Sequence, residues 1–222
     1  MKGPDEDDYK KLARTMRYLR GTREMPLVLE INDIQVIKWW VDASFAVHPD
    51  MKEHTGGVMS LGKGAIYGTS TKQKLVTRSS TESELVGIYD VMPQILWTRH
   101  FLEAQGYAVK DSNVHQENKS AVLLEQNGRG SSSKRTRHLN IRYFFVTDHI
   151  ASKDVSVKYC PTSEMVSDYF TKPLQGSLFR RMRDTIMNVD PGQEHLCDHM
   201  SVGETVRRRV DYCPQKRNAR ET

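Results

Sequence analysis

The chain has 222 residues, of which 37% are hydrophobic and 27% charged, and its 33 basic and 28 acidic side chains give a formal net charge of +5. This composition supports a folded core, and no apolar run approaches the roughly 20 residues of a membrane helix. The 3 cysteines are widely spaced at Cys160, Cys197 and Cys213, which argues against a disulfide framework. We therefore expect an intracellular protein with no secretion signal, no membrane contact and no disulfide partner.

The first predicted element is a helix over residues 9–20. An acidic cluster precedes it, Gly21 ends it, and its apolar residues share one face: Tyr9, Leu12, Ala13, Met16 and Leu19. The acids at its start and the basic residues further along suit the helix dipole. This helix is too short to form a domain, and we expect it to pack on another part of a larger protein.

The remaining pattern alternates between strands and helices. Strands are expected at 27–31, 36–45, 58–61, 65–70, 114–117 and 155–159, with a tight hairpin turn at Gly62-Lys63-Gly64. Helices are expected from Arg78 to Gly106 with a bend at Pro93, then at 119–125, 137–152, through 165–170 to Pro173, and at 177–187. An antiparallel meander followed by strand–helix crossovers predicts an α/β fold with a mixed five-stranded sheet and helices on both faces.

Several acids occupy positions where chemistry is expected. Asp42 lies in the middle of an otherwise apolar strand, which is costly unless the carboxylate is paired or binds a metal; the alternative is an outward-facing acid. Glu82 and Glu84 lie in the first turn of the long helix, where Glu82 better suits the helix dipole. Glu117 ends a strand and Asp168 lies near a helix start, and each of these two has a capping role as its alternative.

A cluster of four such carboxylates cannot stay ionised without cations. Hard oxygen ligands with no matching set of Cys and His residues indicate Mg²⁺ or Mn²⁺. Two such ions about 4 Å apart are the usual apparatus of phosphodiester cleavage.

A family resemblance spans roughly residues 36–188. It is carried by Val41-Asp42-Ala43-Ser44, His54-Thr55-Gly56-Gly57, Ser79-Ser80-Thr81-Glu82-Ser83-Glu84, Glu117-Asn118-Lys119-Ser120-Ala121, the segment from Lys134 to Tyr143, and Asp168-Tyr169-Phe170-Thr171-Lys172-Pro173-Leu174. In this order the motifs resemble the ribonuclease H region of copia-type LTR retrotransposon Pol polyproteins. Residues 9–22 resemble the end of the preceding reverse transcriptase part, so the chain looks like a C-terminal portion of Pol.

The resemblance implies a ribonuclease H-like fold that hydrolyses the RNA strand of RNA/DNA hybrids with two Mg²⁺ or Mn²⁺ ions. By motif, the ligands are Asp42, which bridges both metals, Glu84 near the RNA 2′-hydroxyl, Glu117, and Asp168 at the water-activating metal. Glu84 is preferred over Glu82 because the family's helix glutamate stands about five residues past the cap and precedes apolar residues. The reverse transcriptase part of the same polyprotein is the implied partner.

One departure concerns Glu117, because the family usually has Asp at this position. Glutamate is one methylene longer, and Mg²⁺ demands strict octahedral geometry, so we expect this copy to be weakened or inactive. The alternative function is therefore a catalytically inactive nucleic-acid-binding relic of a truncated element. A third hypothesis is a related nuclease or integrase-type transferase acting on duplex DNA, which the motif order disfavours.

Basic residues supply candidate substrate contacts. The segment 129–142 holds five basic side chains and no acid, and four of them are candidate phosphate contacts: Lys134, Arg135, Arg137 and Arg142. A solvated basic loop is the alternative. The start of the long helix, at Arg78, Ser79, Ser80 and Thr81, is a second candidate phosphate site.

The predicted organisation has three parts. Residues 1–25 are a remnant helix of the reverse transcriptase region, 26–188 form the ribonuclease H-like domain, and 189–222 form a basic tail that we expect to be disordered. The expected location is a cytoplasmic particle or the nucleus.

Overall fold

The computed structural model describes residues 3–127 and 137–190, and the tail from residue 191 onward lies outside this range. Its contacts group into two units, Met1–Pro26 with Val189–Thr222, and Leu27–Asn188. The described element of the first unit is the predicted helix, α1 (Glu6–Gly21), which Asp5 and Asp8 cap reciprocally. Its apolar face is exposed, with Tyr9 63% and Met16 58% accessible. Among the described residues, no helix has the length and apolarity that crossing a membrane requires.

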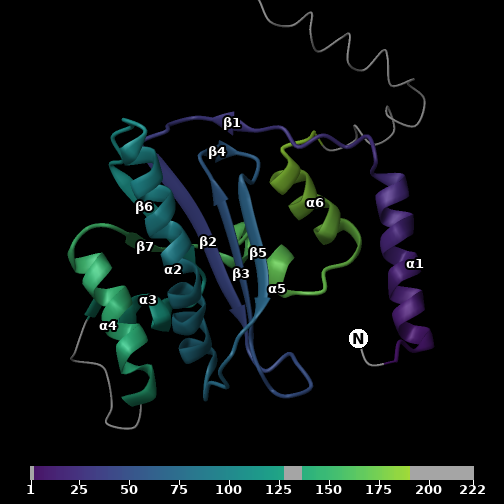
Figure 1. The fold of residues 1–222 in the computed structure, drawn as a ribbon, viewed down its shortest axis with the longest axis horizontal. Coiled ribbons are helices and arrows are strands. Elements are labelled where there is room, and N and C mark those ends of the chain that lie inside the picture. Colours follow the sequence, from purple (N-terminus) through teal and green to yellow (C-terminus); the bar gives the residue numbers. More distant parts are fainter. Residues whose placement is uncertain (1–2, 128–136, 191–222) are drawn as a thin grey trace, which may run out of the picture. The chain divides into compact units, whose positions relative to one another are not determined.

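The second unit is built on a five-stranded sheet with the order β5-β3-β2-β6-β7 (Figure 1). The antiparallel strands β2 (Val36–Ser44), β3 (His54–Ser60) and β5 (Tyr67–Lys72) form the predicted meander. Strands β6 (Asp111–Gln116) and β7 (Ser156–Tyr159) continue the sheet in parallel with β2. This mixed sheet confirms the predicted fold class.

The segment with Gly62–Gly64 connects β3 to β5 in an antiparallel hairpin as predicted, but the connection is not a tight turn. Gly62–Lys63 instead forms a short strand, β4, which pairs with β1 (Glu30–Ile31) in a separate two-stranded sheet. A Cβ atom on Gly62 would collide with the carbonyl oxygen of Glu30, and Gly64 has a φ of +74°. These glycines are therefore explained by the close approach of a second backbone, which local sequence does not reveal.

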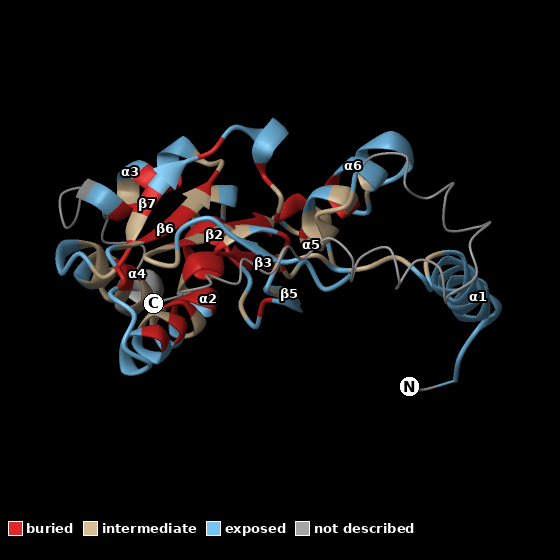
Figure 2. Ribbon diagram, turned by 90° about the horizontal axis from the view of Figure 1, so that it is seen from above, coloured by how far each residue is buried: buried red, intermediate tan, exposed pale blue. Residues whose placement is uncertain are grey.

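The long helix α2 (Ser80–Ala104) passes through Pro93 and packs against β2. With α4 (Arg137–Ala151) it lies on the same side of the sheet in Figure 2. The helix α3 (Lys119–Asn127) follows β6. Alternation along β2 directs its apolar residues into the core formed with α2, which includes Ile37, Trp39, Val41, Leu85, Ile88, Met92 and Ile95.

Of the predicted helix through 165–170, only one turn forms, α5 (Asp168–Thr171). The 3-10 turn η3 (Thr162–Glu164) lies before it, so two short pieces precede α6 (Gly176–Met187). Between the two pieces, the backbone of Met165 has a ψ of 88°, which is not helical, while its side chain is fully buried. Burial of this side chain thus overrides the helical pattern of the segment.

Two adjacent glycines show that helices cover both faces of the sheet. A Cβ atom on Gly57 would lie 3.3 Å from Val91 of α2, whereas one on Gly56 would lie 2.7 Å from Thr171 of α5. Since neighbouring strand residues point to opposite faces, α2 and α5 lie on opposite sides of β3. The predicted two-sided arrangement is confirmed.

Candidate metal centre

Asp42 lies near the end of the central strand β2 and is 1% exposed. It pairs across the antiparallel ladder with Gly56 of β3, so its side chain shares the face on which α5 packs. Its Oδ2 accepts a hydrogen bond from the hydroxyl of Thr171. The buried mid-strand acid therefore faces a polar neighbour and is not an outward-facing surface group.

Glu117 reaches the same place from the adjacent parallel strand. Trp40 of β2 pairs with His115 of β6, and Asp42 and Glu117 each lie two residues further along, at the same edge of the sheet. The Glu117 side chain is 22% exposed. Its buried Oε2 has no hydrogen-bond partner among the described residues.

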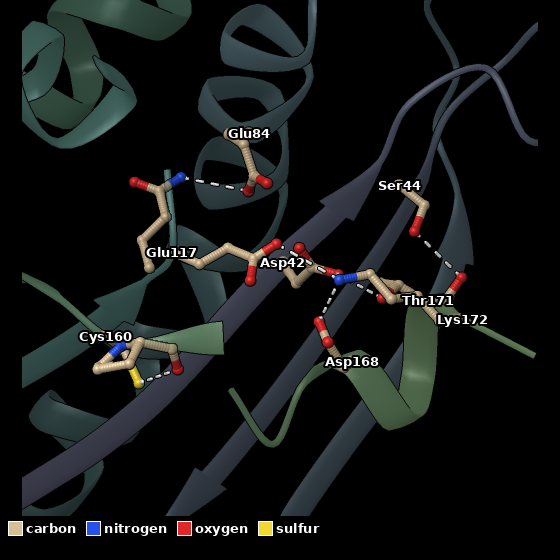
Figure 3. Close-up of polar contacts among 10 residues, drawn as sticks. Asp42, Ser44, Glu84, Glu117, Cys160, Asp168, Thr171 and Lys172 are labelled. Atoms are coloured by element: carbon tan, nitrogen blue, oxygen red, sulfur yellow. Dashed lines mark hydrogen bonds and ion pairs between the residues drawn. The ribbon is translucent and has the colours of Figure 1, made fainter. Parts of the chain in front are cut away.

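Asp168 is the first residue of α5 and is 5% exposed. The absence of a side chain at Gly56 lets this helical turn lie directly on β3, because a Cβ there would lie 2.9 Å from the carbonyl oxygen of Ser167. Asp42, Glu117 and Asp168 each offer one oxygen within 4.8 Å of the others (Figure 3). Three segments far apart in the sequence thus place three carboxylates together.

A lysine ammonium group lies among these three acids (Figure 3). The Nζ atom of Lys172 is 2.6 Å from Asp168 Oδ1, 3.4 Å from Glu117 Oε1 and 3.8 Å from Asp42 Oδ2. Burial alone lowers the pKa of Lys172, but its bond to Asp168 and the charges of the three acids raise this pKa above its usual value. Lys172 therefore stays protonated and partly neutralises the cluster.

Burial raises the pKa of Asp168 to about 6, and the charges of Asp42 and Glu117 add to the rise while Lys172 opposes it. Three carboxylates so close together repel one another, and one positive charge does not balance them. The site is therefore short of positive charge.

Glu84 lies beside this group on the first turns of α2 and is 4% exposed. Its Oε2 accepts a 3.3 Å hydrogen bond from Gln116 Nε2. Burial raises the pKa of Glu84 well above its usual value, and the charges of Asp42 and Glu117 contribute. Glu84 is not one of the three acids that lie within 4.8 Å of one another.

Glu82 has a different environment. Its Oε2 accepts a 2.8 Å hydrogen bond from the backbone N–H of Arg78, and its own N–H donates to the Ser79 hydroxyl at 3.3 Å. These contacts cap the N-terminus of α2. Its carboxylate is thus used within the helix start.

The donor set fits a divalent cation with a preference for oxygen. All the contributed atoms are carboxylate oxygens, and an ammonium group already occupies a cation position among them. The buried Oε2 of Glu117 has no hydrogen-bond partner among the described residues. The nearby thiol of Cys160 does not compete, because burial raises its pKa to about 11, with Glu164, Glu117 and Asp168 contributing. Such ligands suit Mg²⁺ or Mn²⁺.

The predicted substrate contacts have varied positions. Ser80 and Arg78 are exposed and Thr81 is half-buried at the start of α2, while the Ser79 side chain serves as its cap. Lys134 and Arg135 lie outside the described residues, and Arg137 begins α4 with no described side chain.

Arg142 is described, and its guanidinium carbon lies 5.1 Å from the centre of the Tyr89 ring. This side chain therefore joins α4 to α2, and its charge also lowers the pKa of Asp90, which burial raises.

Three contributors to the site have no role assigned by sequence reasoning: Gly56, Thr171 and Lys172. Thr171 and Lys172 stand three and four residues after Asp168, a spacing that places side chains on one helical face. Paired glycines in a strand signal a close approach of another segment. Both signals are present in the sequence, but neither specifies which segment approaches.

No protein-family model matches the chain. It is 27% identical over 187 residues to the "Retrovirus-related Pol polyprotein from transposon TNT 1-94" of Nicotiana tabacum, covering 84% of this chain and 14% of that protein. It is 29% identical over 185 residues to the corresponding polyprotein of transposon RE1 of Arabidopsis thaliana, covering 82% of this chain and 12% of that protein. The chain thus spans a small fraction of the relatives it matches.

Similar solved structures include the N-terminal ribonuclease H domain of a Mycobacterium tuberculosis protein, with a TM-score of 0.43, 12% identity, and coverage of 67% of this chain and 96% of that one. Another is LC11-RNase H1 in complex with an RNA/DNA hybrid, with a TM-score of 0.44, 12% identity, and coverage of 60% and 92%. The sequence relatives identify the chain as a homologue of retrovirus-related Pol polyproteins from copia-like transposons.

Proposed function

We propose that this chain is the ribonuclease H part of a retrotransposon Pol protein and that it hydrolyses the RNA strand of RNA/DNA hybrids. The observation that carries the proposal is the convergence of Asp42, Glu117 and Asp168 from β2, the end of β6 and α5. The sequence similarity to retrotransposon Pol polyproteins supports the choice of substrate.

The residues of the site have distinct proposed tasks. Asp42, Glu117 and Asp168 would hold one divalent cation, and Asp42 with Glu84 would hold a second. Such a pair of ions supplies an activated water and stabilises the departing 3′ oxygen. Thr171 orients the Asp42 carboxylate through its hydrogen bond, and Gln116 orients that of Glu84.

Substrate binding is proposed to depend on the start of α2 and on the basic segment 129–142. Ser80 and Thr81 lie at the helix N-terminus, where backbone N–H groups favour a phosphate. The reverse transcriptase part of the same polyprotein is the proposed partner that helps to hold the hybrid.

The test is cleavage of a hybrid carrying a labelled RNA strand, with Mg²⁺ or Mn²⁺ and with a chelator. We expect the full chain to cut the RNA only with metal, and both Asp42→Asn and Asp168→Asn to lose at least about 100-fold in rate because each removes a charged ligand. Asp111→Asn is the matched control, since this acid pairs with Lys158 away from the site. Metal-independent cleavage, or full activity of Asp42→Asn, would contradict the proposal.

A second candidate is a nucleic-acid-binding relic without activity, favoured by the glutamate at position 117. This alternative predicts that the intact chain binds the hybrid but does not cleave it in either Mg²⁺ or Mn²⁺. Recovery of cleavage in Glu117→Asp would assign the loss to that residue.

A further inference from the structure

The position of Lys172 has a consequence for how the site takes up metal. Its ammonium group is within 4 Å of all three clustered acids, at 2.6 Å from Asp168, 3.4 Å from Glu117 and 3.8 Å from Asp42. Other described lysines in ion pairs contact acids that are exposed or about one-third exposed, as Lys63 does with Glu30 and Lys158 with Asp111. Lys172 instead contacts two acids that are almost completely buried, Asp42 and Asp168.

The backbone holds Lys172 in this position. It is the C-cap of α5, and its N–H donates to the carbonyl oxygen of Asp168 at 2.9 Å. The preceding residue is fixed to β2 twice, because the Thr171 hydroxyl donates to Asp42 and the Thr171 carbonyl accepts from Ser44 Oγ at 3.2 Å. The lysine therefore enters the cluster as part of the same turn that supplies Asp168.

The side chain nevertheless has a route out. It is 34% exposed, and a lysine has four flexible methylenes that let its ammonium move to water without any change in the backbone. A divalent cation in contact with the same oxygens would repel the ammonium strongly at such short distances. The two cations are thus alternatives for one position.

We propose that Lys172 is a built-in counter-ion that holds the three carboxylates together in the metal-free protein and competes with the divalent cation for them. The inference rests on the proposed function only in requiring that these acids bind metal. It predicts that Lys172 stabilises the metal-free fold and weakens metal binding, so that removal of its charge has opposite effects on the two.

The experiment is calorimetric titration of Mn²⁺ into the chelator-treated full chain, with thermal unfolding measured in chelator. Lys172→Met should bind Mn²⁺ about tenfold more tightly, on the scale of one charge-assisted hydrogen bond that the metal no longer displaces. In chelator it should unfold at a lower temperature than the parent chain, because the carboxylates then repel without a counter-ion. Lys172→Arg, which keeps the charge, should bind like the parent.

The matched control is Lys158→Met, which removes an ion pair outside the cluster and should leave Mn²⁺ affinity unchanged. Lys172→Gln replaces Lys172→Met if the latter does not fold. Equal or weaker Mn²⁺ binding by the neutral variants, with binding by the parent, would overturn the role of Lys172 alone. An absence of Mn²⁺ binding in parent and neutral variants alike would overturn the proposed metal site as well, whereas binding by the neutral variants alone would support competition.

Discussion

At the scale of single residues, the site brings together carboxylates that would each be costly to bury in ionised form without a partner. Asp42 and Asp168 are almost completely buried, and a buried carboxylate requires a hydrogen bond or a counter-charge. Thr171 supplies the first and Lys172 the second. The carboxylate of Glu117 is less well compensated, because its contact with the Lys172 ammonium is 3.4 Å long and its Oε2 has no hydrogen-bond partner among the described residues.

The first prediction concerns this glutamate. Glu117→Asp should raise the rate of metal-dependent hybrid cleavage, by up to about 100-fold if the extra methylene misplaces the ligand by about 1 Å. The rate under single turnover in Mg²⁺ measures the effect, and Glu103→Asp, on an exposed part of α2, is the control. An unchanged or lower rate would contradict the hypothesis of a weakened copy.

At the scale of elements, the decisive contact is that of α5 with β3. This helix has a single turn and no propensity to persist alone, so the sheet must hold it. Gly56 provides the space, and Ser70 of β5 donates a 2.7 Å hydrogen bond to the carbonyl oxygen of Phe170. One helical turn thereby carries Asp168, Thr171 and Lys172 to Asp42.

Gly56→Ala should therefore disturb the metal site more than the fold. The new methyl group would lie 2.7 Å from Thr171 and 2.9 Å from the Ser167 carbonyl, and overpacking of this kind costs about 1–3 kcal/mol. We expect a loss of stability in that range together with weaker Mn²⁺ binding, measured by denaturation and calorimetry.

The matched control is Gly57→Ala, whose methyl group would meet Thr69 at 3.0 Å and Val91 at 3.3 Å on the other face. It should lower stability and leave Mn²⁺ affinity unchanged. If the two variants affected Mn²⁺ binding equally, the packing of α5 on Gly56 would not be what positions Asp168.

A second prediction at this scale concerns Glu125 of α3. This side chain is completely buried, and neither oxygen has a hydrogen-bond partner among the described residues. Burial raises the pKa of Glu125 well above its usual value. Since the folded state favours the protonated form, this stabilisation is present below the unfolded pKa of about 4.3 and is lost as the pH rises toward the folded pKa.

Glu125→Gln removes that titration. Within the window between the two pKa values the parent chain loses about 1.4 kcal/mol for each pH unit relative to the variant, so the variant should be the more stable at pH 8 and match the parent near pH 4. Urea denaturation across pH measures this, with the exposed Glu164→Gln as control. Parallel pH profiles for parent and Glu125→Gln would show that the carboxyl is ionised in the folded state.

At the scale of the whole molecule, the net charge of +5 conceals an uneven distribution. The candidate metal centre gathers negative charge, whereas the segment 129–142 contains five basic residues and no acid. The proposed hybrid cleavage requires both a negative site that binds metal and positive residues that bind phosphates, and a net charge of +5 reveals neither of them.

The corresponding prediction is a reduced salt dependence of hybrid binding in Arg135→Ala/Arg137→Ala. If both residues contact phosphates, the slope of log K against log salt should become shallower by about 1.8, at roughly 0.9 for each contact. Fluorescence anisotropy over a salt series measures this. Lys10→Ala is the control, because its ammonium is 3.0 Å from Glu6 in α1. An unchanged slope in the double variant would favour a solvated basic loop.

Local pattern alone determined much of this protein. Strand and helix periods predicted the mixed α/β sheet, because the alternation of buried and exposed residues is imposed by backbone geometry within each segment. An acid in an apolar strand marked Asp42, because burial of an unpaired charge is costly wherever the strand lies. Sequence motifs predicted the other site acids, Glu84, Glu117 and Asp168, and indicated the similarity to Pol polyproteins.

Only the tertiary structure decided how these parts meet. It shortened the helix around Asp168 to one turn, explained Gly56 and Gly62 by the backbones that approach them, and placed the ammonium of Lys172 among the acids. It also placed Glu84 beside the three clustered carboxylates but outside the group whose oxygens lie within 4.8 Å of one another. These outcomes depend on distances between segments far apart in the chain, which packing determines and which no local period or spacing encodes.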